Sequence, residues 1–266
     1  MSDFRIYGES VPDLVPDNEG SPKLLRESRR LAASAGAAWI GQAWGLFTRR
    51  WGVWVGMSFV MLLITTVVSM LPLVGFLSNF LTLFFAGGMM LAAAALAEND
   101  DLEFVYLFGG FQHKFKELLI LTLLYFLVLL LVVFVFVVVM YLTGTNISDW
   151  DSEQPSVAAM AMYGWIILAG FAVLVPVSMM MWFATVLTVL DDVAPWQAMK
   201  MSFQGCVRNI LPFIVYGLVW LGLSLVVGLL AMGLVMLFDW VWLPLVVMSA
   251  LMILVVTPWT MLTVYT

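Results

Sequence analysis

Few side chains in this sequence have the chemistry to bind a metal or to catalyse a reaction. Two aspartate pairs, Asp100-Asp101 and Asp191-Asp192, each follow a long apolar run, and together they could bind a divalent cation through their carboxylates. Each pair also precedes a segment with helical periodicity, where the helix dipole favours carboxylates in the first turn. We therefore interpret both pairs as helix caps and predict no metal site.

The only histidine and the only cysteine complete this inventory of reactive groups. His113 has no thiolate or second histidine at a metal-ligand spacing, so the sequence predicts no zinc site around it. Cys206 has no partner for an intramolecular disulfide and is predicted to be a packing residue. Phosphate-binding, dinucleotide-binding and nucleophile-elbow motifs are absent from the sequence. We therefore predict no catalytic residue and no cofactor, and we expect a protein that is not an enzyme.

The composition explains why reactive groups are scarce. Of 266 residues, 64% are hydrophobic and only 11% are charged, which excludes an ordinary soluble globular domain. The apolar runs reach the roughly 20 residues that an α-helix needs to cross about 30 Å of hydrocarbon. Because lipid offers no partner to backbone amides, each run is predicted to be a helix. The expected fold is an all-α polytopic membrane helical bundle.

Six transmembrane helices are predicted, arranged as three hairpins that are each preceded by an amphipathic interfacial helix. The predicted spans are 54–71, 79–97, 118–142, 158–190, 211–238 and 241–265. The segments before the hairpins, 38–51, 100–119 and 191–213, resemble one another, with Phe111 aligned to Phe203. They divide an integral membrane domain, 21–266, into units of about 21–97, 98–190 and 191–266, after an acidic flexible tail, 1–20.

The positive charges predict the orientation of the chain. All eleven Lys and Arg residues lie in the N-terminal region, the 98–117 loop or the 191–209 loop, whereas the 143–156 loop carries only acidic charges. Short loops rich in Lys and Arg remain on the cytoplasmic side, so both termini are predicted to be cytoplasmic. A helix beginning at Ser21-Pro22 and continuing through Arg29-Arg30 is expected to lie near this surface. Anionic lipid head groups are the expected partners, and no nucleic-acid partner is expected.

Two groups of residues are candidates for function. Aromatic and basic side chains of the interfacial segments are predicted to contact lipid: Trp39, Trp44, Arg49, Arg50, Phe111, Lys114, Lys116, Trp196, Lys200, Phe203 and Arg208. Trp54 is expected at the interface as well. In the fourth span, which we expect at the centre of the bundle, Pro176 is predicted to make a kink and Ser178 to bond a freed carbonyl. Pro258 is predicted to bend the last helix.

Three segments carry a resemblance to a known group of proteins: PWQAMKMSFQGCVRN followed by LPF, AWIGQAWGLF and VPVSMMMWFA. In these segments the chain resembles the YciC-like group of uncharacterised six-span inner-membrane proteins of proteobacteria. It is distantly similar to the membrane region attached to some glycerophosphodiester phosphodiesterases. The resemblance covers roughly 38–265 and implies a multi-pass protein of the bacterial inner membrane, with no catalytic residues to transfer.

Two functions are compatible with spans that contain no ionisable group. Coupled transporters and pumps need such groups inside the membrane, so the sequence argues against them. The first hypothesis is a non-enzymatic inner-membrane protein that organises lipid or an envelope protein partner. The alternative is a passive channel or exporter of an apolar or lipid-like solute, using a cleft near Pro176 and Pro258.

Overall fold

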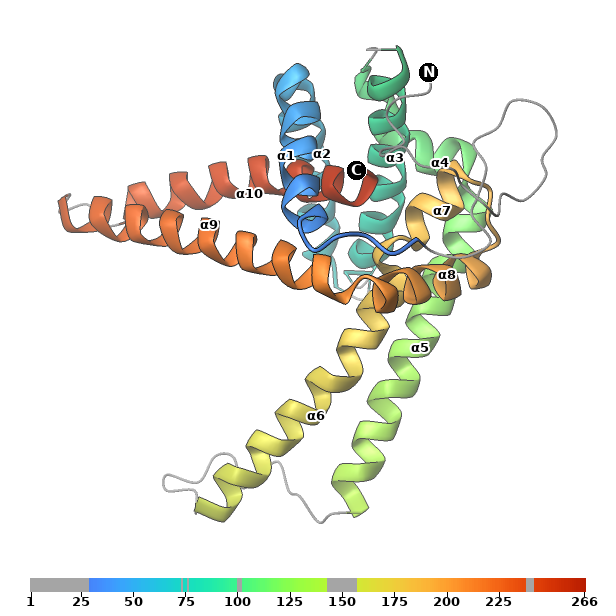
Figure 1. Ribbon diagram of the computed structural model, residues 1–266, viewed down its shortest axis with the longest axis vertical. Helices are drawn as coiled ribbons and strands as arrows, with labels where there is room; N and C mark the ends of the chain where they lie inside the picture. The colour runs from blue at the N-terminus through green and yellow to red at the C-terminus, as the bar shows by residue number, and fades with distance from the viewer. Residues whose placement is uncertain (1–28, 73, 76, 100–101, 143–156, 238–241) are drawn as a thin grey trace.

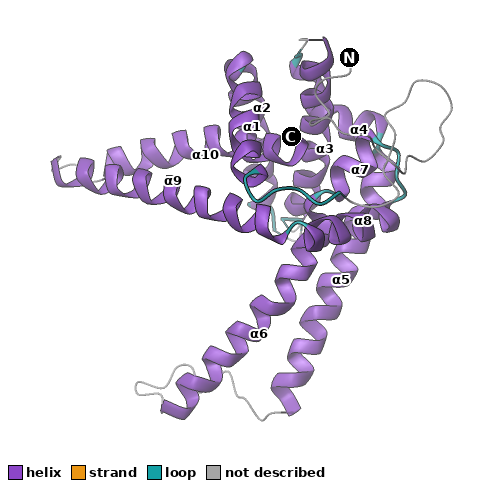
Figure 2. Cartoon of the chain, in the orientation of Figure 1, coloured by secondary structure: helices purple, strands orange, loops and turns teal. Residues whose placement is uncertain are grey.

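The computed structural model describes residues 29–72, 74–75, 77–99, 102–142, 157–237 and 242–266. These residues are almost entirely helical and contain no strand (Figure 2), which confirms the predicted fold class at the level of all-α structure. Several predictions lie outside the described residues: the tail 1–20, the start of a helix at Ser21-Pro22, the pair Asp100-Asp101, the loop 143–156 and part of the turn between the last two spans.

The long helices agree with the predicted spans to within a few residues. They are α2 (Trp51–Ser69), α3 (Leu77–Asn99), α5 (Phe115–Leu142), α6 (Val157–Trp182) with its continuation α7 (Ala184–Leu190), α9 (Ile210–Leu237) and α10 (Trp242–Tyr265). Within the described residues, five stretches are long and apolar enough to cross a membrane, and Met252–Tyr265 of α10 forms a shorter apolar helix. The chain therefore has the helices of a multi-pass membrane protein, while the six-span arrangement stays a prediction.

Short helices precede the three hairpins. They are α1 (Ala35–Arg49), the 3-10 helix η1 (Phe104–Phe108) followed by α4 (Gly109–His113), and α8 (Pro195–Arg208). Residues 29–32 just before α1 have no helical structure, so the predicted helix through Arg29-Arg30 is wrong at this end. The reason is tertiary, because a buried asparagine described below binds the backbone of these residues.

Each short helix meets its long helix at one residue with a similar backbone conformation. The φ and ψ angles are −139° and 44° at Arg50, −130° and 29° at Lys114, and −118° and 33° at Asn209. Three residues before these joints are Phe47, Phe111 and Cys206, and seven residues before them are Ala43, Leu107 and Ser202; each of these side chains is buried or half-buried. Counted from the joint, Phe111 corresponds to Cys206, so the sequence alignment of Phe111 with Phe203 differs by three residues from the structural correspondence.

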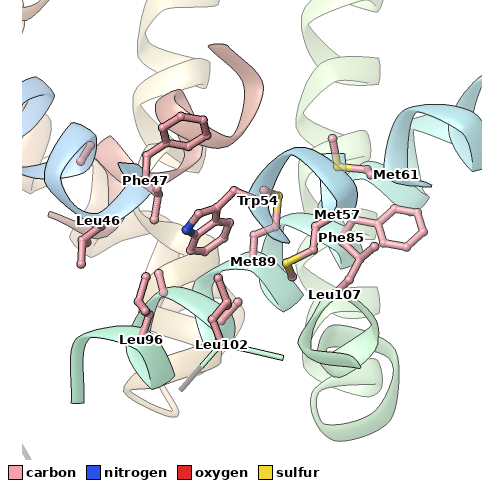
Figure 3. Close-up of a cluster of buried hydrophobic side chains, with 14 residues drawn as sticks. Leu46, Phe47, Trp54, Met57, Met61, Phe85, Met89, Leu96, Leu102 and Leu107 are labelled. Atoms are coloured by element: carbon pink, nitrogen blue, oxygen red, sulfur yellow. The ribbon is translucent and has the colours of Figure 1, made fainter. Parts of the chain in front are cut away.

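The centre of the structure is α3, because small residues let its neighbours approach closely. A Cβ atom on Gly88 would lie 2.2 Å from the carbonyl oxygen of Leu107 in η1. In the most apolar part of the α3 span more than half of the residues are buried, whereas only 6% are buried in the corresponding part of Gly164–Leu190. The prediction that the fourth span is central is therefore wrong. Trp54 is also fully buried beside α3 rather than at an interface, between Leu96, Leu102 and Met89 (Figure 3).

Two hairpins extend from this centre as long arms. The α5/α6 arm and the α9/α10 arm point in different directions (Figure 1), so the described long helices do not share one axis. Along most of α5, α6 and α9, Leu, Val and Phe side chains are exposed, whereas Leu118, Leu121, Val177 and Tyr216, near the central body, are buried. The exposed lengths of these helices carry apolar side chains that suit contact with lipid.

Candidate functional site

Helix α8 has three different faces, and it connects the central body to both arms. Its buried face consists of small or flexible side chains, Ala198, Met199, Ser202 and Cys206, which pack on α6, α7 and α5. Pro195 begins the helix at a position where its missing amide hydrogen is not needed. The small side chains bring α8 close to its neighbours, which leaves the larger apolar side chains on the outside.

The outer apolar face, which we call the α8 stripe, consists of Trp196, Phe203 and Val207 of α8 together with Ile210, the first residue of α9. Their exposed fractions are 49%, 37%, 44% and 46%, respectively. Helical spacing places Met199 near these residues, but Met199 is fully buried, so the apolar surface of α8 is divided between the protein core and the exterior. An exposed apolar stripe on a helix with a fixed opposite face is typical of a helix that lies in a membrane interface.

Basic side chains lie beside the α8 stripe. Lys200 is exposed, and its Nζ atom lies 5.0 Å from the centre of the Trp196 ring, a cation–π arrangement. Arg208 is also exposed in the last turn of α8. Lysine and arginine can keep an alkyl stem on apolar surface while the charged end reaches a phosphate. The α8 surface thus combines the apolar and cationic groups that an anionic lipid would contact.

Ser202 explains why the helix α6–α7 is broken. In an uninterrupted helix the amide of Phe183 would donate to the carbonyl oxygen of Met179. Instead, Phe183 N donates to Ser202 Oγ at 2.9 Å, and Ser202 Oγ donates to Met179 O at 2.7 Å. The hydroxyl is therefore inserted into the helical ladder, which is a recognised cause of a sharp helix break. The predicted kink site, Pro176, lies inside the continuous helix α6.

Cys206 lies one turn after Ser202 on the buried face. Its Sγ atom donates weakly to Met179 O at 3.5 Å, and the side chain is 1% exposed. Burial raises the pKa of the Cys206 thiol to about 12, despite a smaller opposite effect of the hydrogen bond with Ser202. The thiol is therefore neutral at physiological pH, in agreement with its predicted packing role.

Asn209, which the sequence reasoning did not single out, attaches the start of the described chain to the joint between α8 and α9. Its Oδ1 accepts a hydrogen bond from Leu31 N at 2.8 Å. Its Nδ2 donates to Arg29 O and to Gly205 O, both at 2.9 Å. These bonds fix the residues that carry Arg29 and Arg30 next to α8. The only sequence signal was an amide side chain placed between an amphipathic segment and an apolar run.

An ion pair joins the second and third short helical segments. Lys114 Nζ contacts Asp192 Oδ1, although these residues are 78 positions apart. Ala194 is the N-cap of α8 and makes no side-chain cap bond, so the interpretation of Asp191-Asp192 as its caps is wrong. Asp191 is instead the C-cap of α7, and Asp192 has a positive φ of 55°, a conformation that aspartate tolerates better than most residues.

The remaining basic candidates lie on the exterior. Arg49 ends α1 and is exposed, Arg50 is exposed at the joint before α2, and Lys116 is exposed in the first turn of α5. The positions of these side chains permit contact with head groups, so their role in lipid contact stays a prediction.

The aromatic candidates outside α8 pack partly against protein. Trp39 is half-buried, with its ring 5.4 Å from that of Phe213 in α9. Trp44 is 43% exposed and lies 4.8 Å from the ring of Trp259 in α10. Trp259 Nε1 in turn donates to Ile40 O at 3.0 Å. Helix α1 is therefore attached to the inner ends of the α9/α10 arm by aromatic contacts.

Phe111 stabilises the contact of α4 with α3. Its ring stacks on Phe84 at 4.8 Å and meets the edge of Phe85 at 5.2 Å. The chain changes from η1 to α4 at Gly109. A Cβ on Gly110 would lie 2.2 Å from Phe84 O, so the glycine permits close contact with the backbone of α3. This role was not visible in the sequence.

An apolar groove of about 450 Å³ lies between α6 and the α8 stripe. We call it the α6–α8 groove. The α6 side includes Leu168, Phe171, Ala172, Val175, Pro176 and Met179, and the other side is formed by Phe203, Val207 and Ile210. It is a shallow groove that is open along one side rather than an enclosed pocket.

The predicted kink and cleft residues Pro176, Pro258 and Ser178 have different positions relative to this groove. Pro176 lines it, but Pro258 is buried in α10 and does not line it, so the groove is not the predicted cleft between two proline-containing helices. Ser178 Oγ donates to Val175 O at 2.8 Å. The carbonyl that Pro176 leaves without an amide partner is that of Ala172, so Ser178 does not have the predicted role there.

Comparisons with known proteins give one informative match. A 58-residue segment is 48% identical to part of a protein of Burkholderia thailandensis that is described as a probable inner membrane protein. The match covers 22% of this chain and 22% of that protein, so the chain aligns with about a fifth of its relative. No family model matches the chain, and no solved structure matches it. The YciC-like resemblance and the relation to phosphodiesterase membrane regions therefore stay predictions. The apolar helices and this match together identify a multi-pass membrane protein related in part to an inner-membrane protein.

Proposed function

We propose that this chain is a non-enzymatic protein of the bacterial inner membrane that organises anionic lipid at the cytoplasmic leaflet. The observation that carries the proposal is the α8 stripe, which exposes Trp196, Phe203, Val207 and Ile210 beside Lys200 and Arg208 while the opposite face is packed. A helix held in this way presents apolar groups to the acyl boundary and cations to phosphates without first having to fold.

The charges support a lipid surface as the partner. Each Lys or Arg near an anionic surface adds roughly 1 kcal/mol of attraction. Asn209 and the ion pair between Lys114 and Asp192 bring basic segments from all three parts of the chain to the central body. Several weak attractions on one rigid body add together, which would concentrate anionic lipid around the protein.

The orientation of the chain is part of the proposal. We propose that both termini and the short helices face the cytoplasm, because all Lys and Arg residues lie in the N-terminal region and in the segments 98–117 and 191–209. Single cysteines at Thr48 in α1 and Tyr141 at the far end of α5 test this, since both side chains are exposed. In spheroplasts, an impermeant maleimide should label Tyr141→Cys and not Thr48→Cys. The opposite pattern would reject the proposed orientation.

Lipid enrichment tests the function directly. Three proteins are compared in nanodiscs of mixed phosphatidylglycerol and phosphatidylcholine. They are the native protein, the neutral variant Lys200→Gln/Arg208→Gln and the charge-preserving control Lys200→Arg/Arg208→Lys. We expect native mass spectrometry to show fewer retained phosphatidylglycerol molecules for the neutral variant only. Equal retention by all three proteins would contradict a role of α8 in lipid organisation. Specific co-purification of an envelope protein with equal lipid retention would favour the partner version of this function.

The α6–α8 groove favours a second candidate function, passive passage of an apolar or lipid-like solute. Pro176 lines this groove, and its walls are apolar. Proteoliposomes that contain the protein should then move a fluorescent lipid or an apolar dye between leaflets faster than protein-free vesicles. Unchanged rates would remove this candidate and leave lipid organisation unaffected.

A further inference from the structure

We propose that the α6–α8 groove binds one acyl chain of an anionic phospholipid of the cytoplasmic leaflet, with the head group beside Lys200 and Arg208. The inference deepens the proposed function, on which it rests, by naming the lipid class and the place where it is held. Its basis is a groove of about 450 Å³ whose walls come from the apolar helix α6 and from the apolar stripe of α8.

The chemistry of the walls selects an acyl chain. Leucine, phenylalanine, valine, proline and methionine side chains form the groove, with no polar side chain among its lining residues. Such a surface cannot hydrogen-bond a polar solute, which would lose its water without compensation. Met179 has a flexible thioether that adapts to irregular shapes, which suits a chain with many conformers.

The length of the groove is close to the hydrocarbon thickness of one leaflet. Its α6 wall extends from Leu168 to Met179. At about 1.5 Å per residue these eleven steps span about 16 Å, close to half of the roughly 30 Å hydrocarbon core. Met179 lies at the α8 end, where Ser202 binds its carbonyl. A chain that enters beside α8 would therefore reach about the middle of the bilayer at Leu168.

The charges at the α8 end select an anionic head group. Lys200 is one turn before Phe203, and Arg208 follows Val207, so both cations are on the helix that forms the groove wall. Lys200 Nζ is held over the Trp196 ring, at the side of α8 that faces away from the packed core. A phosphate at this end would meet positive charge, whereas a second protein helix in the groove would leave Lys200 beside apolar surface.

A photoreactive lipid tests the proposal. The full-length protein in nanodiscs is mixed with phosphatidylglycerol that carries a diazirine in one acyl chain, and the labelled peptides are mapped by mass spectrometry. Phosphatidylcholine that carries the same diazirine-bearing acyl chain tests the head-group preference. Ala172→Trp fills the groove, and Leu174→Trp, at an exposed position of α6 outside the groove, is the matched control.

We expect the phosphatidylglycerol probe to label groove residues of α6 and α8, and Ala172→Trp to reduce this labelling at least fivefold while Leu174→Trp does not. Equal labelling by the phosphatidylglycerol and phosphatidylcholine probes would overturn the proposed preference for an anionic head group. Uniform labelling along α6 in all variants would overturn the site. A disulfide cross-link between the Phe171→Cys residues of two copies would show that a second copy of the protein occupies the groove. That result would also overturn the proposed lipid site. Retention of phosphatidylglycerol by the native protein but not by Lys200→Gln/Arg208→Gln, without groove labelling, would reject this site and leave the proposed function intact.

Discussion

The hydroxyl of Ser202 replaces a backbone hydrogen bond between Phe183 and Met179, and a substitution tests this role. Ser202→Ala leaves a buried amide and a carbonyl without this bridge. We expect the free energy of unfolding in detergent to fall by about 1–3 kcal/mol, the usual cost of an unsatisfied buried polar group. The measurement is the shift of the midpoint of unfolding by sodium dodecyl sulfate.

Ser178→Ala is the control for this experiment. The Ser178 hydroxyl is exposed and bonds only Val175 O within its own helix, so its loss should change stability by less than about 0.5 kcal/mol. Similar effects of the two substitutions would show that the inserted hydroxyl has no special role.

Cys206 gives a prediction about pH, because burial raises the pKa of its thiol from 9.0 to about 12. Between pH 9 and about pH 12 the unfolded protein loses the thiol proton of Cys206, while the folded protein keeps it. The contribution of Cys206 to the free energy of unfolding is therefore complete below pH 9 and decreases as the pH rises towards 12. We expect Cys206→Ala to have a weaker decline in stability over this alkaline range.

Maleimide labelling provides an independent measurement at neutral pH. The folded protein should react very slowly, because the thiol is buried and protonated, and the unfolded protein should react quickly. Rapid labelling of the folded protein at pH 7 would mean that Cys206 is accessible, in contradiction to the packing of α8 on α6.

At the scale of elements, the contact of α3 with η1 depends on Gly88. A Cβ there would lie 2.2 Å from Leu107 O and 2.7 Å from Tyr106 O, and both neighbours are backbone atoms that cannot move independently. We expect Gly88→Ala to separate these elements and to lower the free energy of unfolding by about 1–3 kcal/mol. Thermal unfolding of the purified protein in detergent measures the change.

Gly45→Ala is the matched control for Gly88→Ala. Gly45 lies inside α1, and a Cβ there would have open space within 4 Å. Alanine should therefore stabilise this helix by roughly 0.5–1 kcal/mol through its smaller loss of backbone entropy. Destabilisation by both substitutions would indicate that the space available for a Cβ atom does not decide the outcome at these two sites.

At the scale of the whole molecule, the α5/α6 and α9/α10 arms point in different directions (Figure 1). Both expose apolar side chains along their length, so both belong in hydrocarbon. A flat bilayer has one normal, and two hairpins in this arrangement cannot both cross it upright. We expect a bilayer to bring the arms closer to parallel, with bending at Phe183 and at the Asn209 joint.

Spin labels at the exposed positions Tyr141 and Leu230, one on each arm, measure this change. The distance between the labels should be shorter in nanodiscs than in detergent micelles, which impose no common direction. Two labels on the central body, at Thr48 and Lys116, should keep the same distance in both environments. An unchanged distance between the arms would mean that their arrangement is rigid.

The helix boundaries and apolar spans could be predicted because they depend on local composition. A helix in lipid must satisfy its own backbone, so an apolar run of sufficient length becomes a helix whatever surrounds it. Amphipathic periodicity located the short helices before the hairpins, including α8, which begins at Pro195. The positions of Trp196, Lys200, Phe203 and Arg208 on the exterior also agree with the amphipathic pattern.

Predictions that depended on contacts between distant residues were less successful. The break of the helix at Phe183 was not predicted, because it depends on a hydroxyl from α8 that enters the ladder. The kink predicted at Pro176, inside α6, stays a prediction. The predicted fourth span, 158–190, is the longest of the six predicted spans, yet α3 is central because its small residues allow close approach. Hydrophobicity alone cannot distinguish lipid contact from core packing, since both favour the same side chains.

By itself the sequence determined a multi-pass helical chain and the segments that cross apolar surroundings, because length and composition control whether a helix is stable in lipid. Only the tertiary structure decided which face of α8 is buried, where α6 ends and how Asn209 holds residues 29–31. These features depend on single hydrogen bonds and on backbone contacts within a few ångströms between residues far apart in the chain. Such contacts leave no periodic pattern in the sequence.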